Sequence, residues 1–333
     1  MILLIGANSF IGAYTVDALL SHGYKVAVTA RKEKFREYYE KKNVDFYKLD
    51  LTNELDFEKL PKKDVECVIL LAGLLPANVN VDLDIDENAA DYFRINTIGT
   101  INVLEYCRKN NIKRVISNCS YADVCKSWGK GYPITEEEPR GFLYKGDHAV
   151  YVFSKNAAND VLEYYNQQHG MKNAIFRFPP VYGVGPHGSL YVNGHYKKSG
   201  MQIFIEKAEK GEPITIYGDP QLSRDVIYVK DVAEAYCLAC NSEKTYGLYN
   251  MTSGVPLTLQ KQVETIIEVF SKDKKSEIYY DNTVNNNTPS YLYSMKKAKD
   301  DFGFVPKYSD FRDMMIDYKK DLENKQYREI FEY

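Results

Sequence analysis

The sequence predicts an α/β fold in which a doubly wound parallel sheet is followed by a smaller, mixed α/β lobe. Short apolar runs alternate with helical stretches over the first half of the chain, and this rhythm stops near Phe178. Near-continuous apolar strands separated by helices are typical of a parallel sheet that helices cover on both faces. At 333 residues the chain is long enough for one large or two ordinary domains.

Composition excludes several classes of function. The hydrophobic fraction of 44% and charged fraction of 27% are those of a soluble globular protein. The net charge of −3 provides no bulk attraction to nucleic acid or anionic lipid. No apolar run approaches the roughly 18 residues that span a bilayer, and the opening MILLI, which Gly6 interrupts, predicts a buried strand rather than a signal peptide. We therefore expect a cytoplasmic protein that binds neither nucleic acid nor membrane.

Each element of the first half follows from its own pattern. The apolar runs predict strands at residues 1–5, 25–30, 44–50, 66–73, 113–120 and 172–179. Helical periodicity predicts helices at residues 10–23, 90–110 and 151–170. The first of these helices ends at Gly23, a common helix stop.

A glycine turn lies between the first strand and the first helix. A dinucleotide-binding fold needs a tight turn there, because backbone N–H groups and the positive end of the helix dipole face the pyrophosphate. The flanking strand and helix make the glycine spacing specific. We therefore expect NAD or NADP to bind at this turn, through the residues Gly6, Asn8, Ser9, Phe10, Ile11 and Gly12.

The end of the second strand bears on the choice of cofactor. A carboxylate there would bind the ribose 2′-OH of NAD, but the chain offers Arg31 and Lys32 instead. A planar guanidinium can grip the 2′-phosphate of NADP, so the sequence slightly favours NADP over NAD; a solvated surface charge is the alternative for Arg31. Asp50 and Leu51 end the third strand, where the adenine would lie. Asp50 either accepts a hydrogen bond from the adenine amino group or begins a turn.

After Phe178 the pattern changes. Residues 179–200 are rich in Gly, Pro and Tyr and predict an irregular connection whose length indicates a functional loop. A helix at 201–213, a strand at 214–219 and a helix at 229–240 follow. We expect an NAD(P)-binding Rossmann domain over residues 1–177, to which residues 229–252 return, and a substrate-binding lobe over residues 178–333.

The pattern Tyr-x-x-x-Lys occurs three times in a chain with 29 tyrosines: at Tyr38, Tyr151 and Tyr293. Active sites of α/β folds lie at the carboxyl ends of parallel strands. Only Tyr151 opens a predicted helix after such a strand, the one that ends at Ser120. The position of this match in the predicted fold therefore identifies Tyr151 and Lys155 as the candidate catalytic pair.

Motifs along almost the whole chain resemble the extended short-chain dehydrogenase/reductase family, the NAD(P)-dependent sugar-nucleotide epimerases, dehydratases and reductases. They are, in order, LIGANSFIG, LAG, NTIGTINVLE, VISNCS with YVFSK, FRFPPVYGVG, RDVIYVKDVAEA and FGFVP. The resemblance implies further contacts with the cofactor from Leu71, Ala72, Gly73, Asn96 and Phe178.

The resemblance also implies a catalytic triad of Ser120, Tyr151 and Lys155. Lys155 lies one helical turn from Tyr151. Its ammonium, with the nicotinamide ring, would lower the Tyr151 pKa from about 10. Tyr151 would then act as a base when a sugar alcohol is oxidised and as an acid when a ketone is reduced. Ser120 would donate a hydrogen bond to the reacting oxygen, and Lys155 would also hold the nicotinamide ribose.

Four residues are expected to contact the substrate: Ser120, Tyr121, Pro180 and Arg224. Arg224 matches a family position that contacts a diphosphate; a salt bridge with Asp225 or Asp231 is the alternative. The chain departs from the family at Pro180, where relatives often carry Asn or Thr. It also lacks the Thr-Asp-Glu run of the dehydratases, which argues against 4,6-dehydration.

Two enzymatic functions remain open. Family frequency favours a sugar-nucleotide epimerase, whose cofactor is not consumed, whereas Arg31 favours an NADPH-dependent reductase of a keto-sugar nucleotide. A carbanion-type epimerase with Cys119 and His195 is a weaker alternative. A non-catalytic NAD(P)-binding regulator is least favoured, because the chain keeps the Tyr–Lys pair. By analogy with the family, we expect a homodimer formed through residues 96–109 and 151–169.

The six cysteines are scattered, which fits a reducing compartment. Cys237 and Cys240 form a C-x-x-C pair without a second pair, so they are interpreted as small helix residues that pack. The five histidines form no cluster with ligand spacing. The sequence therefore predicts no metal site.

Overall fold

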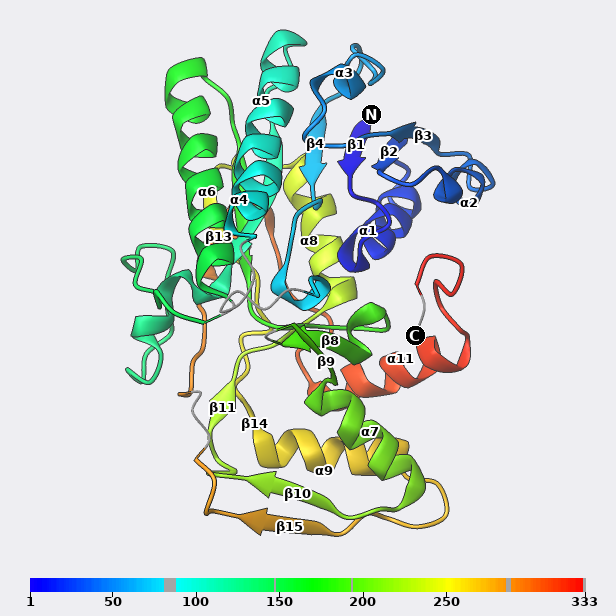
Figure 1. The fold of residues 1–333 in the computed structure, drawn as a ribbon, viewed down its shortest axis with the longest axis vertical. Helices are drawn as coiled ribbons and strands as arrows, with labels where there is room; N and C mark the ends of the chain where they lie inside the picture. Colours follow the sequence, from blue (N-terminus) through cyan, green and yellow to red (C-terminus); the bar gives the residue numbers. More distant parts are fainter. Residues whose placement is uncertain (81–87, 147, 193, 286–288, 332–333) are drawn as a thin grey trace.

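The computed structural model describes residues 1–80, 88–146, 148–192, 194–285 and 289–331 (Figure 1). Its centre is a seven-stranded sheet with the strand order β13-β6-β5-β4-β1-β2-β3, in which all neighbouring strands are parallel. The strands are β1 (Ile2–Ile5), β2 (Val26–Ala30), β3 (Asp45–Lys48), β4 (Cys67–Leu70), β5 (Val115–Ser120), β6 (Ala174–Phe178) and β13 (Gly247–Asn250). The strand order reverses between β1 and β4, and in doubly wound folds the cofactor binds at such a reversal. This confirms the predicted fold class.

Helices cover both faces of the sheet, which is why most of its strands are apolar along their length; the edge strand β3, with Asp45 and Lys48 exposed, is the exception. Because side chains alternate along a strand, Leu4 packs toward α1 and α8, whereas Leu3 packs toward α5 and α6. The helices of this half are α1 (Phe10–Ser21), α2 (Arg36–Glu40), α3 (Glu54–Phe57), α4 (Ala89–Tyr92), α5 (Gly99–Lys109), α6 (Ala149–His169) and α8 (Val229–Asn241). A π-helix, Phe93–Ile98, leads into α5, and a 3-10 helix, Tyr121–Ser127, follows β5.

Most of the rest of the chain forms a mixed lobe beyond the carboxyl edge of the sheet (Figure 1). Its helices are α7 (Gly200–Lys210), α9 (Leu259–Phe270) and α11 (Phe311–Glu323). The helix α10 (Lys296–Phe302) instead packs against β13, where the Tyr249 hydroxyl donates to the Asp301 carboxylate at 2.8 Å. The strands of the lobe pair as β10 (Ile214–Tyr217) with β15 (Ile278–Asp281), β11 (Ser223–Arg224) with β14 (Leu257–Thr258), and β12 (Ile227–Tyr228) with β7 (Val181–Tyr182).

Many elements of the second half were not predicted, among them α9, α10, α11 and β15. The connection at residues 179–200 contains a hairpin of β8 (Ser189–Val192) and β9 (His195–Lys198). The seventh strand, β13, is too short to show a clear period in sequence. Residues 229–252 supply α8 and β13 of the sheet layer, while the domain boundary at residue 177 stays a prediction. Within the described part of the chain, no helix has both the length and the apolarity to cross a bilayer.

Candidate active site

The glycine turn is tight on both sides. Gly6 has a φ of +93°, and a Cβ there would lie 2.6 Å from the backbone nitrogen of Ala72. A Cβ on Gly12 would lie 2.4 Å from the carbonyl oxygen of Gly6. Ser9 is the N-cap of α1, and its Oγ accepts a hydrogen bond from the Gly12 N–H at 3.2 Å. Only glycine fits the two outer positions, so the backbone can approach a pyrophosphate at the N-terminus of α1.

Neighbouring segments hold this turn in place. The hydroxyl of Tyr39 donates to the carbonyl oxygen of Ala7 at 2.7 Å, a support that sequence reasoning missed. The ring of Phe10 is buried and packs edge-on against His187, with the ring centroids 5.0 Å apart. Asn8 and Ile11 are half-buried. Phe10 therefore supports the turn from behind rather than offering its side chain to a ligand.

Arg31 and Lys32, which are predicted to contact the adenosine part of the cofactor, are more exposed than the glycine turn. Arg31 and Lys32 follow β2 directly and are exposed, and neither has an ion-pair partner among the described residues. The Asp50 carboxylate accepts hydrogen bonds from the backbone N–H and hydroxyl of Thr52, at 2.9 and 2.7 Å. Asp50 therefore begins a turn, and its contact with the adenine stays a prediction. Leu51 is buried against Gly99, where a Cβ would lie 2.9 Å from the Cβ of Leu51.

The segment after β4 is tied to α6 through Asn96. The N–H groups of Leu71 and Ala72 donate to the carbonyl oxygen of Ile5, while Gly73 is exposed. Asn96, in the π-helix, accepts from the Leu74 N–H at 2.8 Å and donates to the Ser154 hydroxyl at 3.0 Å. The Asn96 amide is thus engaged within the protein. We infer that it positions the helix of Tyr151, and its contact with the cofactor stays a prediction.

Tyr151 and Lys155 lie on the first turns of α6, and only 8% and 5% of their surfaces are exposed. Burial raises the pKa of Tyr151, and the neighbouring Cys119 thiol raises it further. Burial lowers the pKa of Lys155 to about 8, which Cys119 opposes. The Lys155 ammonium has no hydrogen-bond or ion-pair partner among the residues described. A buried ammonium without a partner is costly, so this position fits a bound group that offers hydroxyl oxygens, such as a cofactor ribose.

Strand register places Ser120 and Cys119 on opposite faces of the sheet. Ser120 pairs with Phe178, which packs in the core under α1 and α8. Cys119 packs in the core under α5 and α6, the face of Lys155. The Ser120 Oγ accepts from the Ala122 N–H at 3.2 Å. The structure therefore brings Tyr151 and Lys155 together but places Cys119, not Ser120, on their face of the sheet, and the catalytic role of Ser120 stays a prediction.

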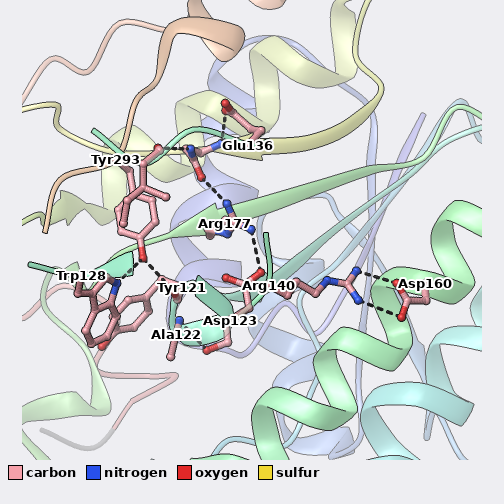
Figure 2. Close-up of polar contacts among 12 residues, drawn as sticks. Tyr121, Ala122, Asp123, Trp128, Glu136, Arg140, Asp160, Arg177 and Tyr293 are labelled. Carbon is pink, nitrogen blue, oxygen red and sulfur yellow. Dashed lines mark hydrogen bonds and ion pairs between the residues drawn. The ribbon is translucent and has the colours of Figure 1, made fainter. Parts of the chain in front are cut away.

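A buried ion pair holds the segment after β5 against β6 (Figure 2). An Arg177 Nη donates to the Asp123 carboxylate at 2.8 Å, and each side chain is only 2% exposed. The second Nη of Arg177 donates to the side-chain oxygen of Asn250. The backbone N–H of Asn250 in turn donates to the Glu136 carboxylate at 2.8 Å. Burial raises the pKa of Asp123, and the Arg177 charge opposes this. The network fixes the backbone on which Tyr121 is carried.

Beside this network, aromatic rings from distant parts of the sequence stack in one cluster. The ring centroids of Trp128 and Tyr291 are 4.6 Å apart, and those of Tyr121 and Trp128 are 5.6 Å apart. The Tyr293 hydroxyl donates to the carbonyl oxygen of Tyr121 at 2.7 Å and accepts from the Trp128 Nε1 at 3.2 Å (Figure 2). Sequence reasoning found Tyr121 but missed Trp128 and Tyr291. Trp128 could have been singled out because it is the single tryptophan of the chain.

Arg224 lies close to this cluster. Burial raises the pKa of Tyr121, and the positive charge of Arg224 opposes this increase. Arg224 itself is exposed, and neither of its predicted alternative partners pairs with it. Asp225 accepts from the Tyr293 N–H, and Asp231 accepts from the N–H groups of Lys307 and Tyr308. The guanidinium thus stays available to a ligand.

Comparison with known proteins decides the family. Residues 2–252 match the model of the NAD dependent epimerase/dehydratase family. The chain is 30% identical over 296 residues to a putative UDP-glucose 4-epimerase of Methanocaldococcus jannaschii, which covers 84% of this chain and 88% of the relative. This chain belongs to the NAD dependent epimerase/dehydratase family.

Solved structures of epimerases agree with this membership. A UDP-N-acetylglucosamine 4-epimerase from Methanobrevibacter ruminantium, in complex with UDP-N-acetylmuramic acid, superimposes with a TM-score of 0.78 at 25% identity, over 98% of both chains. The UDP-glucose 4-epimerase of Thermus thermophilus in complex with NAD gives a TM-score of 0.73 at 26% identity, over 96% of this chain and 98% of that one. The chain is therefore an NAD-dependent enzyme of the epimerase/dehydratase type.

The lysines of the other two Tyr-x-x-x-Lys matches have partners within the protein. Lys42 forms an ion pair with Asp17 at 2.6 Å, and its ammonium lies over the ring of Tyr38. Lys297, the partner of Tyr293 in the third Tyr-x-x-x-Lys match, donates to the carbonyl oxygen of Leu248 at 2.8 Å. Both lysines are therefore engaged in the fold, unlike Lys155. Cys119 is buried and His195 exposed, so the weaker carbanion alternative gains no support.

The lowered pKa of Lys155 can be tested without a substrate, through the stability of the folded protein. Because burial lowers this pKa to about 8, the unfolded chain binds more protons than the folded chain between about pH 8 and pH 10.4. We expect the unfolding free energy of the wild type to rise in this window, relative to Lys155→Met, by about 2–3 kcal/mol. Urea denaturation from pH 7 to pH 10.5 measures it, and parallel profiles for the two chains would contradict it.

Proposed function

We propose that this protein is a nucleotide-sugar epimerase that removes a hydride from a sugar alcohol and returns it to the other face of the carbon. One observation carries the proposal: Tyr151 and Lys155 are buried side by side on α6, and Lys155 lacks a partner among the described residues. The names of the relatives, UDP-glucose and UDP-N-acetylglucosamine 4-epimerase, support nucleotide sugars as substrates.

The proposed mechanism divides the chemistry between cofactor and protein. The glycine turn would hold the pyrophosphate of NAD or NADP, and the bound cofactor would supply the acceptor and donor of the hydride. Tyr151 takes the proton of the sugar hydroxyl at its Oη and gives it back when the ketone is reduced. The ammonium of Lys155, one turn away, stabilises the phenolate and so counteracts the burial that raises the Tyr151 pKa. Exclusion of water from this buried site strengthens that attraction.

The substrate is proposed to extend from Tyr151 toward the lobe. The exposed Arg224 is suited to a diphosphate, because its planar fork can donate two parallel hydrogen bonds. The stacked rings of Tyr121, Trp128 and Tyr291 offer an apolar contact for a sugar or base. Pro180 is half-buried, and its carbonyl oxygen accepts a hydrogen bond from the Ile227 N–H. Because proline has no polar side-chain atom, its contact with the substrate is proposed to be apolar.

Cofactor retention distinguishes the epimerase from the reductase that Arg31 favours. An epimerase returns its hydride within one catalytic cycle, so its cofactor need not leave. We expect native mass spectrometry of the purified protein to show one bound nicotinamide dinucleotide and activity without added cofactor. An empty site, with consumption of NADPH by a keto-sugar nucleotide, would assign the protein to the reductases.

Arg31 is proposed to select NADP over NAD. Both Arg31 and Lys32 are exposed cations at the end of β2, where a 2′-phosphate would lie. We expect Arg31→Ala to weaken NADP binding by about tenfold or more, because a charge-assisted hydrogen bond is lost. NAD binding should change less than about twofold, as measured by calorimetry. The exposed Lys34 provides a control, Lys34→Ala, and equal losses of both cofactors in Arg31→Ala would contradict the role.

We also propose a homodimer formed through α5 and α6, which lie side by side at one edge of the molecule (Figure 1). Two large hydrophobic side chains of this region are exposed: Ile98, at 49%, just before α5, and Tyr164, at 55%, on α6. Burying both against a second copy would remove apolar surface from water. Sedimentation velocity measures the association state, and a monomer at micromolar concentration would contradict the proposal. A cytoplasmic location stays a prediction.

A further inference from the structure

Three different metal-binding groups meet where the end of α1 packs on α8. His22 is the C-cap of α1, whereas Glu234 and Cys237 lie one turn apart on α8. The His22 Nε2 is 2.9 Å from a carboxylate oxygen of Glu234, and single ligand atoms of all three residues lie within 4.8 Å of one another. The sequence predicted no metal site, because 212 positions separate His22 from Glu234.

We propose that His22, Glu234 and Cys237 bind a zinc ion, with water as the fourth ligand. Imidazole nitrogen, carboxylate oxygen and thiolate sulfur are the donor set of zinc, and the thiolate disfavours calcium and magnesium. Ligand bonds of about 2.0–2.3 Å in a tetrahedron place neighbouring donor atoms roughly 3.3–3.7 Å apart. The donors therefore need to move by about 1 Å or less. The side chains of His22 and Glu234 are 40% and 42% exposed, so they have room to adjust.

Cys237 is only 1% exposed, whereas the side chains of His22 and Glu234 are 40% and 42% exposed. A metal at this site would therefore have its sulfur ligand inside the protein and its other two protein ligands at the surface. A cysteine in this position limits the access of water to the metal from one side only.

Two nearby cysteines provide a control for this site, and its distance from the glycine turn lets metal binding be measured independently of catalysis. Cys67 and Cys240 lie near this group, with their sulfur atoms 3.6 Å apart, but they are not members of it. The site lies at the C-terminal end of the 12-residue helix α1, about 18 Å along the helix from the glycine turn. A metal here would join α1 to α8 without touching the proposed cofactor or substrate. Metal binding is therefore testable whether or not the proposed epimerase activity is found.

Titration of the full-length, tag-free protein with Co²⁺ and then Zn²⁺ tests the proposal. We expect one equivalent of Co²⁺ to produce a sulfur-to-cobalt charge-transfer band that Zn²⁺ abolishes. Cys237→Ser should remove the band, His22→Gln should weaken Zn²⁺ binding by about tenfold or more, and Cys240→Ser should retain both. The proposal is overturned if wild type shows no band, or if Cys240→Ser rather than Cys237→Ser removes the band. His22→Gln changes an exposed side chain, so the test does not depend on a core substitution.

Discussion

Replacing Tyr151 with phenylalanine is expected to lower turnover by about 10³-fold while leaving cofactor affinity within a few-fold of wild type. The phenol is the only group proposed to exchange a proton with the sugar hydroxyl, and removal of a general acid–base group costs about 10²–10⁴-fold in rate. The ring itself remains, so the packing of α6 against Tyr92 is preserved; these ring centroids are 6.5 Å apart. Conversion of UDP-glucose and UDP-N-acetylglucosamine, measured by chromatography, gives the rate.

Tyr92→Phe is the matched control, because Tyr92 is a buried phenol in the same cluster. It should retain activity within a few-fold of wild type. Normal turnover in Tyr151→Phe would refute the assignment of the acid–base role.

Breaking the Arg177–Asp123 pair is expected to cause the largest loss of stability. Each side chain is 2% exposed, so Arg177→Met leaves a buried carboxylate without its cation. Loss of one partner of a buried ion pair costs about 3–5 kcal/mol. Urea unfolding of the cofactor-free protein, monitored by fluorescence of the single tryptophan, measures the difference. Because this pair holds the segment that carries Tyr121, we expect KM for the nucleotide sugar to rise as well.

The control for this prediction is drawn in the same view (Figure 2). Arg140 and Asp160 form an ion pair at 2.7 Å, but their side chains are 39% and 65% exposed. Solvent screens such a pair, so Arg140→Ala should cost about 1 kcal/mol or less. The double variant Arg177→Met with Asp123→Leu should recover part of the loss, because it leaves no unpaired buried charge. Equal losses in Arg177→Met and Arg140→Ala would show that burial does not determine the energy.

The part of the site that was predictable from sequence is the part formed by local segments. The glycine turn is a single stretch, and its role follows from its place between a strand and a helix. Tyr151 and Lys155 are one helical turn apart, so helical geometry alone puts them together. The strand predictions succeeded best for β1, β2 and β4, which are buried on both faces and are therefore apolar throughout. The hairpin at residues 189–198 was missed, because its residues are half-buried or exposed and show no apolar run.

Contacts between distant segments could not be predicted in this way. Whether Ser120 or Cys119 faces α6 depends on strand register, which a one-residue change inverts. The engagement of Asn96 by Leu74 and Ser154 depends on how the π-helix packs against α6. Trp128 and Tyr291 stack across 163 positions of sequence, because backbone hydrogen bonds join their two segments; the N–H of Gly129 donates to the carbonyl oxygen of Ser290 at 2.7 Å.

By itself, the sequence determined the doubly wound sheet, the glycine turn after its first strand, and the spacing of Tyr151 and Lys155, because each depends on local periodicity or spacing. Only the tertiary structure decided that Lys155 lacks a partner among the described residues, that Arg224 is exposed beside stacked rings, and that His22 meets Cys237 on α8. Burial and long-range contact set these properties, and no local pattern encodes which distant side chain will occupy a given space.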